Sequence, residues 1–186
     1  MIQPWNILES RKTFEDNFLS LRTDKCQRAD GHTVPTYHVL EFTDWVTLIP
    51  ITDEGNIVLI QEYRHAGGIV LTGIPGGVLE PGEENIEAAG RRELREETGY
   101  TAREMIPVGT CFPNPAVQNN RLHYYLATGC QKTHEQSLDS NEDIAVLELP
   151  YKEFLAYETF HHQHALHAAA LFYTERYLSQ HPHLRP

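Results

Sequence analysis

The sequence contains no long hydrophobic run. Its longest apolar stretches, such as Ile57–Ile60, are the size of a strand and far shorter than the roughly 20 residues that a membrane-spanning helix requires. The start, Met1–Trp5, lacks the basic and apolar segments of a secretory signal. We therefore expect a cytoplasmic protein that has no membrane partner.

Cysteine is scarce. Cys26, Cys111 and Cys130 are odd in number and widely spaced, which argues against a disulfide framework and against a zinc site. We expect three free thiols in a reducing compartment.

Positive charge is also in short supply, because 15 Lys and Arg residues face 26 Asp and Glu residues and the net charge is −11. Such a surface repels nucleic acid and acidic membranes. We expect no nucleic-acid partner. A phosphate ester remains a possible ligand provided that cations mediate the contact.

The order of predicted elements indicates an α+β fold in which helices flank a mixed sheet. We expect a small N-terminal β-strand region over residues 1–40 and one larger domain over residues 41–182. Strand patterns cover residues 5–14, 17–22, 36–42, 45–51, 57–64, 69–72, 100–111, 122–130 and 144–149, and helices are predicted over 83–98 and near 151–157 and 163–179. Residues 74–82, with two prolines and three glycines, are predicted to be a loop.

Three carboxylates share one face of the helix predicted over residues 83–98. Glu93 precedes Glu96 by three residues and Glu97 by four, the spacing of neighbours on a helix surface. Like charges at this spacing repel one another, but Mg²⁺ prefers oxygen ligands and would hold them together. Arginines at 91, 92 and 95 are interleaved and could brace the carboxylates.

The alternative interpretation of this segment is a solvated helix face with Glu–Arg pairs, which is the usual meaning of such a charge run. The glycine-rich passage before the helix and Gly99 after it weaken that interpretation.

The segment resembles the Nudix box, Gly-x5-Glu-x7-Arg-Glu-U-x-Glu-Glu-x-Gly-U, in which U is a bulky apolar or aromatic residue. Gly77-x5-Glu83 fits the first part, and residues 92–100 fit every fixed position of the second. Eight residues instead of seven separate Glu83 from Arg92. The additional residue could be absorbed by a π-bulge at Gly90 or by unwinding of the first helical turn, or Glu84 could take the place of Glu83.

The resemblance implies a Nudix-type α/β/α sandwich and a set of site residues. Glu93, Glu96, Glu97 and the backbone carbonyl of Gly76 would bind Mg²⁺, with Mn²⁺ as a possible substitute. The catalytic set would comprise Glu96, Arg92 and Glu142, where Glu142 is the general base and Asp143 the nearby alternative. Glu142 could instead be a turn residue.

A closer resemblance, to the ADP-ribose pyrophosphatase subgroup, rests on Ile60–Arg64 and on Pro115, fifteen residues after Tyr100. It implies that Arg64 and Pro115 bind substrate, although Arg64 could instead pair with Glu62. Gly73 departs from the subgroup, in which many members have a glutamate.

The function implied is Mg²⁺-dependent hydrolysis of a nucleoside diphosphate linked to another group, with ADP-ribose giving AMP and ribose 5-phosphate. The alternatives are a Nudix hydrolase for another nucleoside diphosphate sugar or a dinucleotide, and a non-catalytic module that binds ADP-ribose. A homodimer formed through the N-terminal region is also implied by the resemblance.

The histidines at positions 161, 162, 164 and 167 are predicted to form a polar helix face, because their spacing drifts around a helix and does not match a zinc site.

Overall fold

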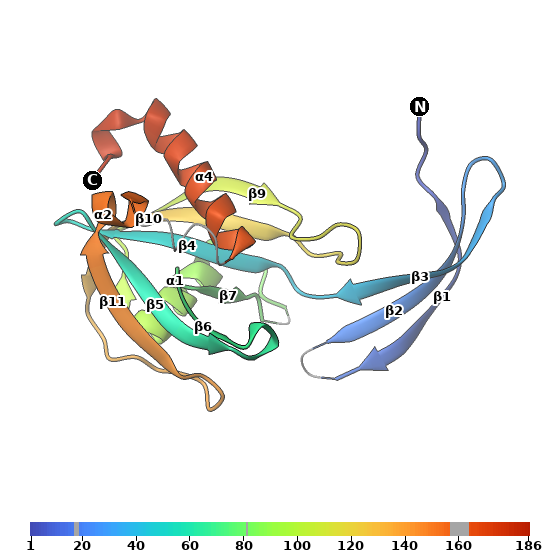
Figure 1. The fold of residues 1–186 in the computed structure, drawn as a ribbon, viewed down its shortest axis with the longest axis horizontal. Helices are drawn as coiled ribbons and strands as arrows, with labels where there is room; N and C mark the ends of the chain where they lie inside the picture. The colour runs from blue at the N-terminus through green and yellow to red at the C-terminus, as the bar shows by residue number, and fades with distance from the viewer. Residues whose placement is uncertain (17–18, 81, 157–163) are drawn as a thin grey trace. The chain divides into compact units, whose positions relative to one another are not determined.

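The computed structural model describes residues 1–16, 19–80, 82–156 and 164–186. The chain divides into two compact units (Figure 1). The first comprises Met1–Asp44 with Phe112–Arg121, and the second comprises Trp45–Cys111 with Leu122–Pro186. Residues 112–121 were expected to belong to the second domain, but in the structure they contact the first unit.

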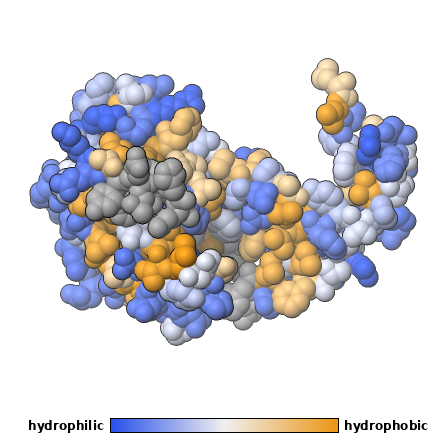
Figure 2. Space-filling view, in the orientation of Figure 1, coloured by the Kyte–Doolittle hydropathy of each residue, from blue (hydrophilic) through white to orange (hydrophobic). Residues whose placement is uncertain are grey.

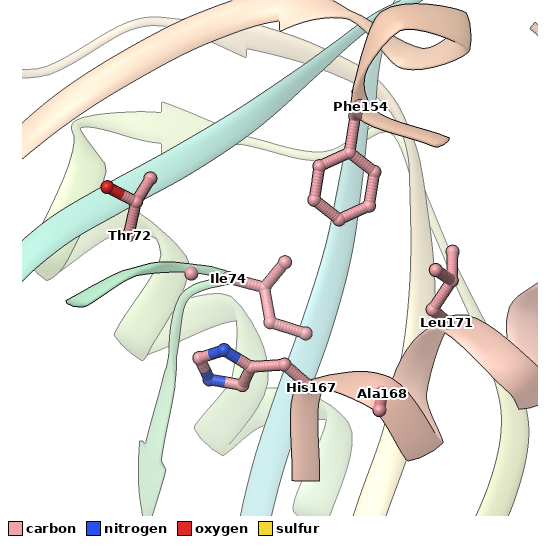
Figure 3. A pocket seen from close by; sticks show the side chains of 7 residues that line it. Thr72, Ile74, Phe154, His167, Ala168 and Leu171 are labelled. Atoms are coloured by element: carbon pink, nitrogen blue, oxygen red, sulfur yellow. The ribbon is translucent and has the colours of Figure 1, made fainter. Parts of the chain in front are cut away.

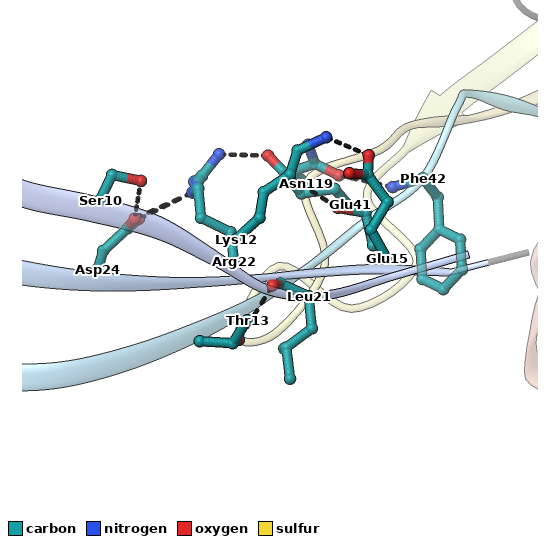
Figure 4. Close-up of polar contacts among 11 residues, drawn as sticks. Ser10, Lys12, Thr13, Glu15, Leu21, Arg22, Asp24, Glu41, Phe42 and Asn119 are labelled. Carbon is teal, nitrogen blue, oxygen red and sulfur yellow. Dashed lines mark hydrogen bonds and ion pairs between the residues drawn. The ribbon is translucent and has the colours of Figure 1, made fainter. Parts of the chain in front are cut away.

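The first unit is a three-stranded antiparallel sheet in the order β1-β2-β3. Its strands are β1 (Asn6–Glu15), β2 (Ser20–Gln27) and β3 (Thr33–Glu41). Polar side chains link all three strands: Ser10 donates to Asp24 at 2.6 Å, and Arg22 bridges Asp24 and Glu41 (Figure 4).

The segment Phe112–Arg121 joins this unit through hydrogen bonds to β3 and the residues after it. The backbone N–H of Leu40 donates to the carbonyl of Val117 at 2.7 Å, and the Tyr37 hydroxyl donates to the carbonyl of Ala116 at the same distance.

The second unit is built on an eight-stranded mixed sheet, counted over the described residues, with the central order β11-β5-β4-β10-β8. Its strands are β4 (Trp45–Thr52), β5 (Asn56–Arg64), β6 (Ile69–Gly73), β7 (Gly76–Val78), β8 (Tyr100–Thr101), β9 (Glu104–Cys111), β10 (Leu122–Lys132) and β11 (Ile144–Pro150). Its helices are α1 (Ile86–Thr98), α2 (Tyr151–Ala156) and α4 (Ala165–Gln180), with short 3₁₀ turns η1 (His65–Gly67) and η2 (Pro182–Leu184). The strands β4 and β10 are parallel, and the other pairs in this sheet are antiparallel.

Two hydrophobic layers cover the two faces of this sheet. Along β5, Ile57 and Leu59 pack in the layer shared with α2 and α4, whereas Val58 packs in the layer shared with α1. This alternation is the two-residue period of a strand buried on both faces. The α/β/α arrangement predicted from the sequence is confirmed (Figure 1).

Two details correct the predicted elements. The passage over residues 74–82 is not entirely a loop, because Gly76–Val78 pairs with β4. The central helix begins at Ile86 rather than at Glu83. Its N-cap is Asn85, whose side chain accepts a hydrogen bond from Ala88 N–H at 3.1 Å, and Gly99 ends it in the left-handed conformation (φ 75°).

The additional residue between Glu83 and Arg92 is therefore absorbed before the helix, and the helix is continuous through Gly90. A π-bulge at Gly90 is not present. Gly90 lies against β4, where a side chain would press on Leu48 and Val46. Its small size allows the helix to approach the sheet closely.

The three cysteines are free thiols, as predicted. No described helix has the length and apolar character needed to span a bilayer.

Candidate active site

The face of α1 that packs on the sheet carries two buried carboxylates one helical turn apart. Glu93 is 9% exposed and Glu97 is 5% exposed. Burial raises the pKa of Glu93 to about 7 and that of Glu97 to about 9, because a carboxylate loses hydration when it leaves water. Glu96 lies on the same helix and is more accessible.

The glycines of β7 make room for these carboxylates. The Glu97 carboxylate accepts a hydrogen bond from the backbone N–H of Gly76 at 2.9 Å. A side chain at Gly77 would collide with the Glu93 carboxylate, and one at Gly76 would collide with the backbone of β4. Gly76 is therefore required by the close approach of β7 to β4, and Gly77 leaves room for the Glu93 carboxylate.

Arg92 connects the carboxylates to the preceding loop. Its guanidinium donates to Glu93 at 2.9 Å, to Glu96 at 3.1 Å, to Glu83 at 3.3 Å and to the carbonyl of Val78 at 3.2 Å. The planar fork of arginine suits several oxygen acceptors at once. Arg92 therefore fixes the orientation of the acidic side chains.

The structure distinguishes Glu83 from Glu84. Glu83 binds Arg92 and also accepts a hydrogen bond from the backbone N–H of Glu80 at 3.1 Å. Glu84 is exposed. Glu83 thus retains the arginine contact despite the additional residue, because the loop and not the helix accommodates it.

Glu142 and Glu62 belong electrostatically to this cluster. The negative charge of Glu142 contributes to the raised pKa of Glu62, Glu93 and Glu97, which places it within interaction range of all three. The Glu142 carboxylate also accepts a hydrogen bond from the backbone N–H of Asp139 at 3.0 Å. Glu142 is therefore a turn residue and is also close enough to the acidic cluster to interact with its charges.

Sequence reasoning missed Glu62 as a member of the cluster and treated it only as a partner for Arg64. The ion pair between Arg64 and Glu62 is present at 2.5 Å. Burial raises the pKa of Glu62, and Arg64 opposes that shift. The available signal was a carboxylate near the end of a largely apolar strand, two residues before Arg64.

Pro115 lies in the first unit. Its role in substrate binding stays a prediction. Asp143 is exposed beside Glu142.

The histidine prediction was wrong for the residues that the structure describes. His167 is partly buried, with its ring against Gly73 of β6, and His164 caps α4, so neither forms a polar helix face. His161 and His162 lie outside the described residues.

The oxygen atoms of the acidic cluster are the candidate ligands for a divalent cation. Across the described residues no group of three or more His, Cys, Asp or Glu side chains converges in a ready-made metal site. In this arrangement Arg92 holds Glu93 and Glu96. The donors are nevertheless the hard oxygen ligands that Mg²⁺ prefers, and two are buried with raised pKa values. The chemistry of this donor set therefore fits a divalent cation.

Comparison with known proteins agrees with this geometry. Residues 42–171 match the NUDIX domain model, and residues 5–40 match the nucleoside diphosphate sugar hydrolase N-terminal domain model. The chain is 33% identical over 111 residues to an ADP-ribose pyrophosphatase of Bacillus subtilis, covering 59% of this chain and 60% of that protein.

Two further proteins match over more of the chain. A methanol dehydrogenase activator of Bacillus methanolicus is 30% identical over 151 residues, covering 81% of this chain and 80% of that protein. A crystal structure of an ADP compounds hydrolase is similar in fold, with a TM-score of 0.81 at 22% identity over 97% of this chain and 97% of that chain. Because the NUDIX model covers well over half of the chain, this protein belongs to the Nudix hydrolase family.

Proposed function

We propose that this protein hydrolyses the diphosphate of a nucleoside diphosphate linked to another group, with ADP-ribose as the leading substrate and Mg²⁺ as the cofactor. Mn²⁺ is a possible substitute. The observation that carries the proposal is the buried pair Glu93 and Glu97 on one helix face, packed against the glycines of β7. Similarity to the ADP-ribose pyrophosphatase of Bacillus subtilis supports the choice of substrate.

In this proposal Glu93, Glu96, Glu97 and the carbonyl of Gly76 would hold the metal. When bound, the cation supplies positive charge that neutralises the diphosphate and polarises the phosphorus. Arg92 would orient the carboxylates through the hydrogen bonds that it already makes.

The remaining groups would handle substrate and proton. Arg64 would donate to phosphate or ribose oxygens, since a guanidinium fork matches such acceptors. Glu142 would accept a proton from water as the water oxygen bonds to one phosphorus and the bond from that phosphorus to the bridging oxygen breaks. ADP-ribose would yield AMP and ribose 5-phosphate. Asp143 remains the alternative base.

Product analysis by mass spectrometry with Mg²⁺ would test this proposal on ADP-ribose, a nucleoside diphosphate sugar and a dinucleotide. Glu97→Gln should abolish turnover while the thermal unfolding midpoint changes little, and Glu84→Gln, at an exposed position, is the matched control. Turnover by Glu97→Gln at the wild-type rate would refute the assignment. Tight binding of ADP-ribose without any product would instead indicate a non-catalytic module.

A second candidate substrate class is another nucleoside diphosphate sugar. Two observations favour it: the match of residues 5–40 to the nucleoside diphosphate sugar hydrolase N-terminal domain, and 29% identity over 160 residues to a GDP-mannose pyrophosphatase of Klebsiella pneumoniae. Preferential cleavage of such a sugar in the same panel would select this alternative.

We also propose that the protein is a homodimer joined through the N-terminal sheet and located in the cytoplasm. The edge strand β1 is exposed along its whole length. Trp5, Ile7, Leu8 and Phe14 are exposed there or just before it, and Figure 2 shows hydrophobic and hydrophilic residues side by side on this unit. An exposed edge strand is a template for pairing with another chain. Sedimentation showing a monomer at micromolar concentration would contradict the dimer.

A further inference from the structure

A pair of imidazoles connects the start of α4 to β6. His167 projects from α4 toward the segment that carries Thr72 and Ile74 (Figure 3). Its ring occupies the space that a side chain at Gly73 would fill. Burial lowers the pKa of His167 to about 3, so this ring is neutral at physiological pH.

The second ring stacks on the first. The centroids of His164 and His167 are 4.3 Å apart and the rings are inclined by 13°. His164 is half-buried and is the N-cap of α4, where its Nδ1 accepts a hydrogen bond from the backbone N–H of Leu166 at 3.2 Å. An accepting Nδ1 carries no proton, so in the neutral ring the proton is on Nε2. His164 therefore offers one N–H donor.

The proposed phosphate-binding arginine acts electrostatically on both rings. The charge of Arg64 contributes to the lowered pKa of both histidines, so the guanidinium is within electrostatic range of the stack. Arg64 pairs with Glu62, whose charge in turn acts on Glu97. Among the described residues, none is bonded to Nε2 of His164. Electrostatic interactions thus connect the acidic cluster to Glu62, Glu62 to Arg64, and Arg64 to His164, whose Nε2–H is available as a hydrogen-bond donor.

We propose that His164 is a substrate-binding residue: its Nε2–H donates to a phosphate or sugar oxygen of the nucleoside diphosphate substrate beside Arg64, and His167, packed on Gly73, is the positioning residue that holds the His164 ring. The proposal rests on the proposed function, because it assigns an additional contact to the same substrate. It gives the histidines, which the hydrolytic chemistry does not use, a role in recognition.

The direct test compares His164→Asn with wild type in calorimetric binding of the methylene analogue of ADP-ribose, which cannot be cleaved, with Mg²⁺ present. Asparagine is a strong N-cap, so α4 keeps its cap while the ring and its N–H are lost. We expect Kd to rise about tenfold, the effect of one hydrogen bond to a charged acceptor. His183→Asn, at an exposed histidine, is the matched control and should bind like wild type.

Measuring the Kd of AMP and of ribose 5-phosphate separately would show which half of the substrate carries the oxygen that His164 contacts. A loss confined to AMP assigns the contact to the nucleotide half of the substrate, and a loss confined to ribose 5-phosphate assigns it to the other half. Either result supports the proposal. Equal Kd values for His164→Asn and wild type with all three ligands would overturn it.

The supporting role of His167 has its own test. His167→Phe keeps a flat ring on Gly73 and should retain wild-type affinity for the analogue, whereas His167→Ala should weaken binding about as much as His164→Asn. Rescue by phenylalanine distinguishes ring support from a polar role of His167. A thermal unfolding measurement on each variant confirms that it is folded. If wild type does not bind the analogue at all, the proposed substrate fails, which is separable from failure of the histidine contact.

Discussion

The backbone N–H of Gly76 donates a 2.9 Å hydrogen bond to the carboxylate of Glu97, which joins the glycine strand β7 to the last turn of α1. This bond holds one carboxylate in place and favours its ionised form, against the opposing effect of burial. The geometry of the acidic cluster therefore depends on the glycines of β7 as much as on the glutamates.

Gly77→Ala should lower kcat by about tenfold or more, because a methyl group there displaces the Glu93 carboxylate from its position over the strand. The melting temperature should change little, since the displaced carboxylate is the end of a flexible side chain. Gly67→Ala, where a methyl group makes only ordinary contact at 3.4 Å, is the control. Wild-type kcat in Gly77→Ala would show that the position of Glu93 is unimportant.

Arg92→Lys should lower kcat/KM by about tenfold or more, because lysine retains the charge but lacks the planar fork that contacts Glu83, Glu93 and Glu96 together. Arg95→Lys is the matched control, since the Arg95 guanidinium makes a longer ion pair, at 3.6 Å, with the carboxylate of Glu96. Steady-state kinetics on both variants would check this expectation, and equal losses in the two would contradict it.

Stabilisation by Mg²⁺ should grow between pH 6 and pH 9. The folded protein holds protons on Glu93 and Glu97 up to about pH 7 and pH 9, whereas the ordinary value is 4.5. The folded state therefore binds more protons than the unfolded state in this window, and without metal its free energy of unfolding falls as pH rises. A cation that takes the place of these protons reverses the trend.

Urea unfolding with Mg²⁺ and with EDTA, at pH 6 and pH 9, would measure this effect. The doubly substituted Glu93→Gln, Glu97→Gln protein should show no such dependence on Mg²⁺. A shift of equal size at both pH values in the wild type would be inconsistent with the assigned carboxylates.

His167 should make a pH-dependent contribution of the opposite sign. Its folded pKa of about 3 is below the ordinary value of 6.5, so the unfolded chain binds the proton first as pH falls. This contribution to the free energy of unfolding is complete above pH 6.5 and is lost as pH falls toward 3. The loss is about 1 kcal/mol at pH 5.5. His167→Phe should remove this dependence, which urea unfolding at pH 7.5 and pH 5.5 in EDTA would detect. An identical change in both proteins would argue against a buried neutral His167.

The sequence predicted the strands, the three helices and the acidic helix face, because periodicity and glycine punctuation are local signals. It did not predict β7, since three residues are too few to show a period and their pairing depends on β4. It also missed the position of His167. Helical spacing describes a face of α4, but the absence of a side chain at Gly73, almost a hundred residues earlier, determines what that face contacts.

The N-cap of α1 at Asn85 separates two parts of the motif, Gly77–Glu83 and residues 92–100, that a single helix would have held in one fixed register. Because the additional residue lies in non-helical chain, the length of the segment before Asn85 can vary without turning Glu93 and Glu97 away from the sheet. An engineer could therefore insert or delete residues there, for example to carry a label or to alter access to the site, while the register of the carboxylates is preserved. Only the ion pair between Glu83 and Arg92 would need to be restored.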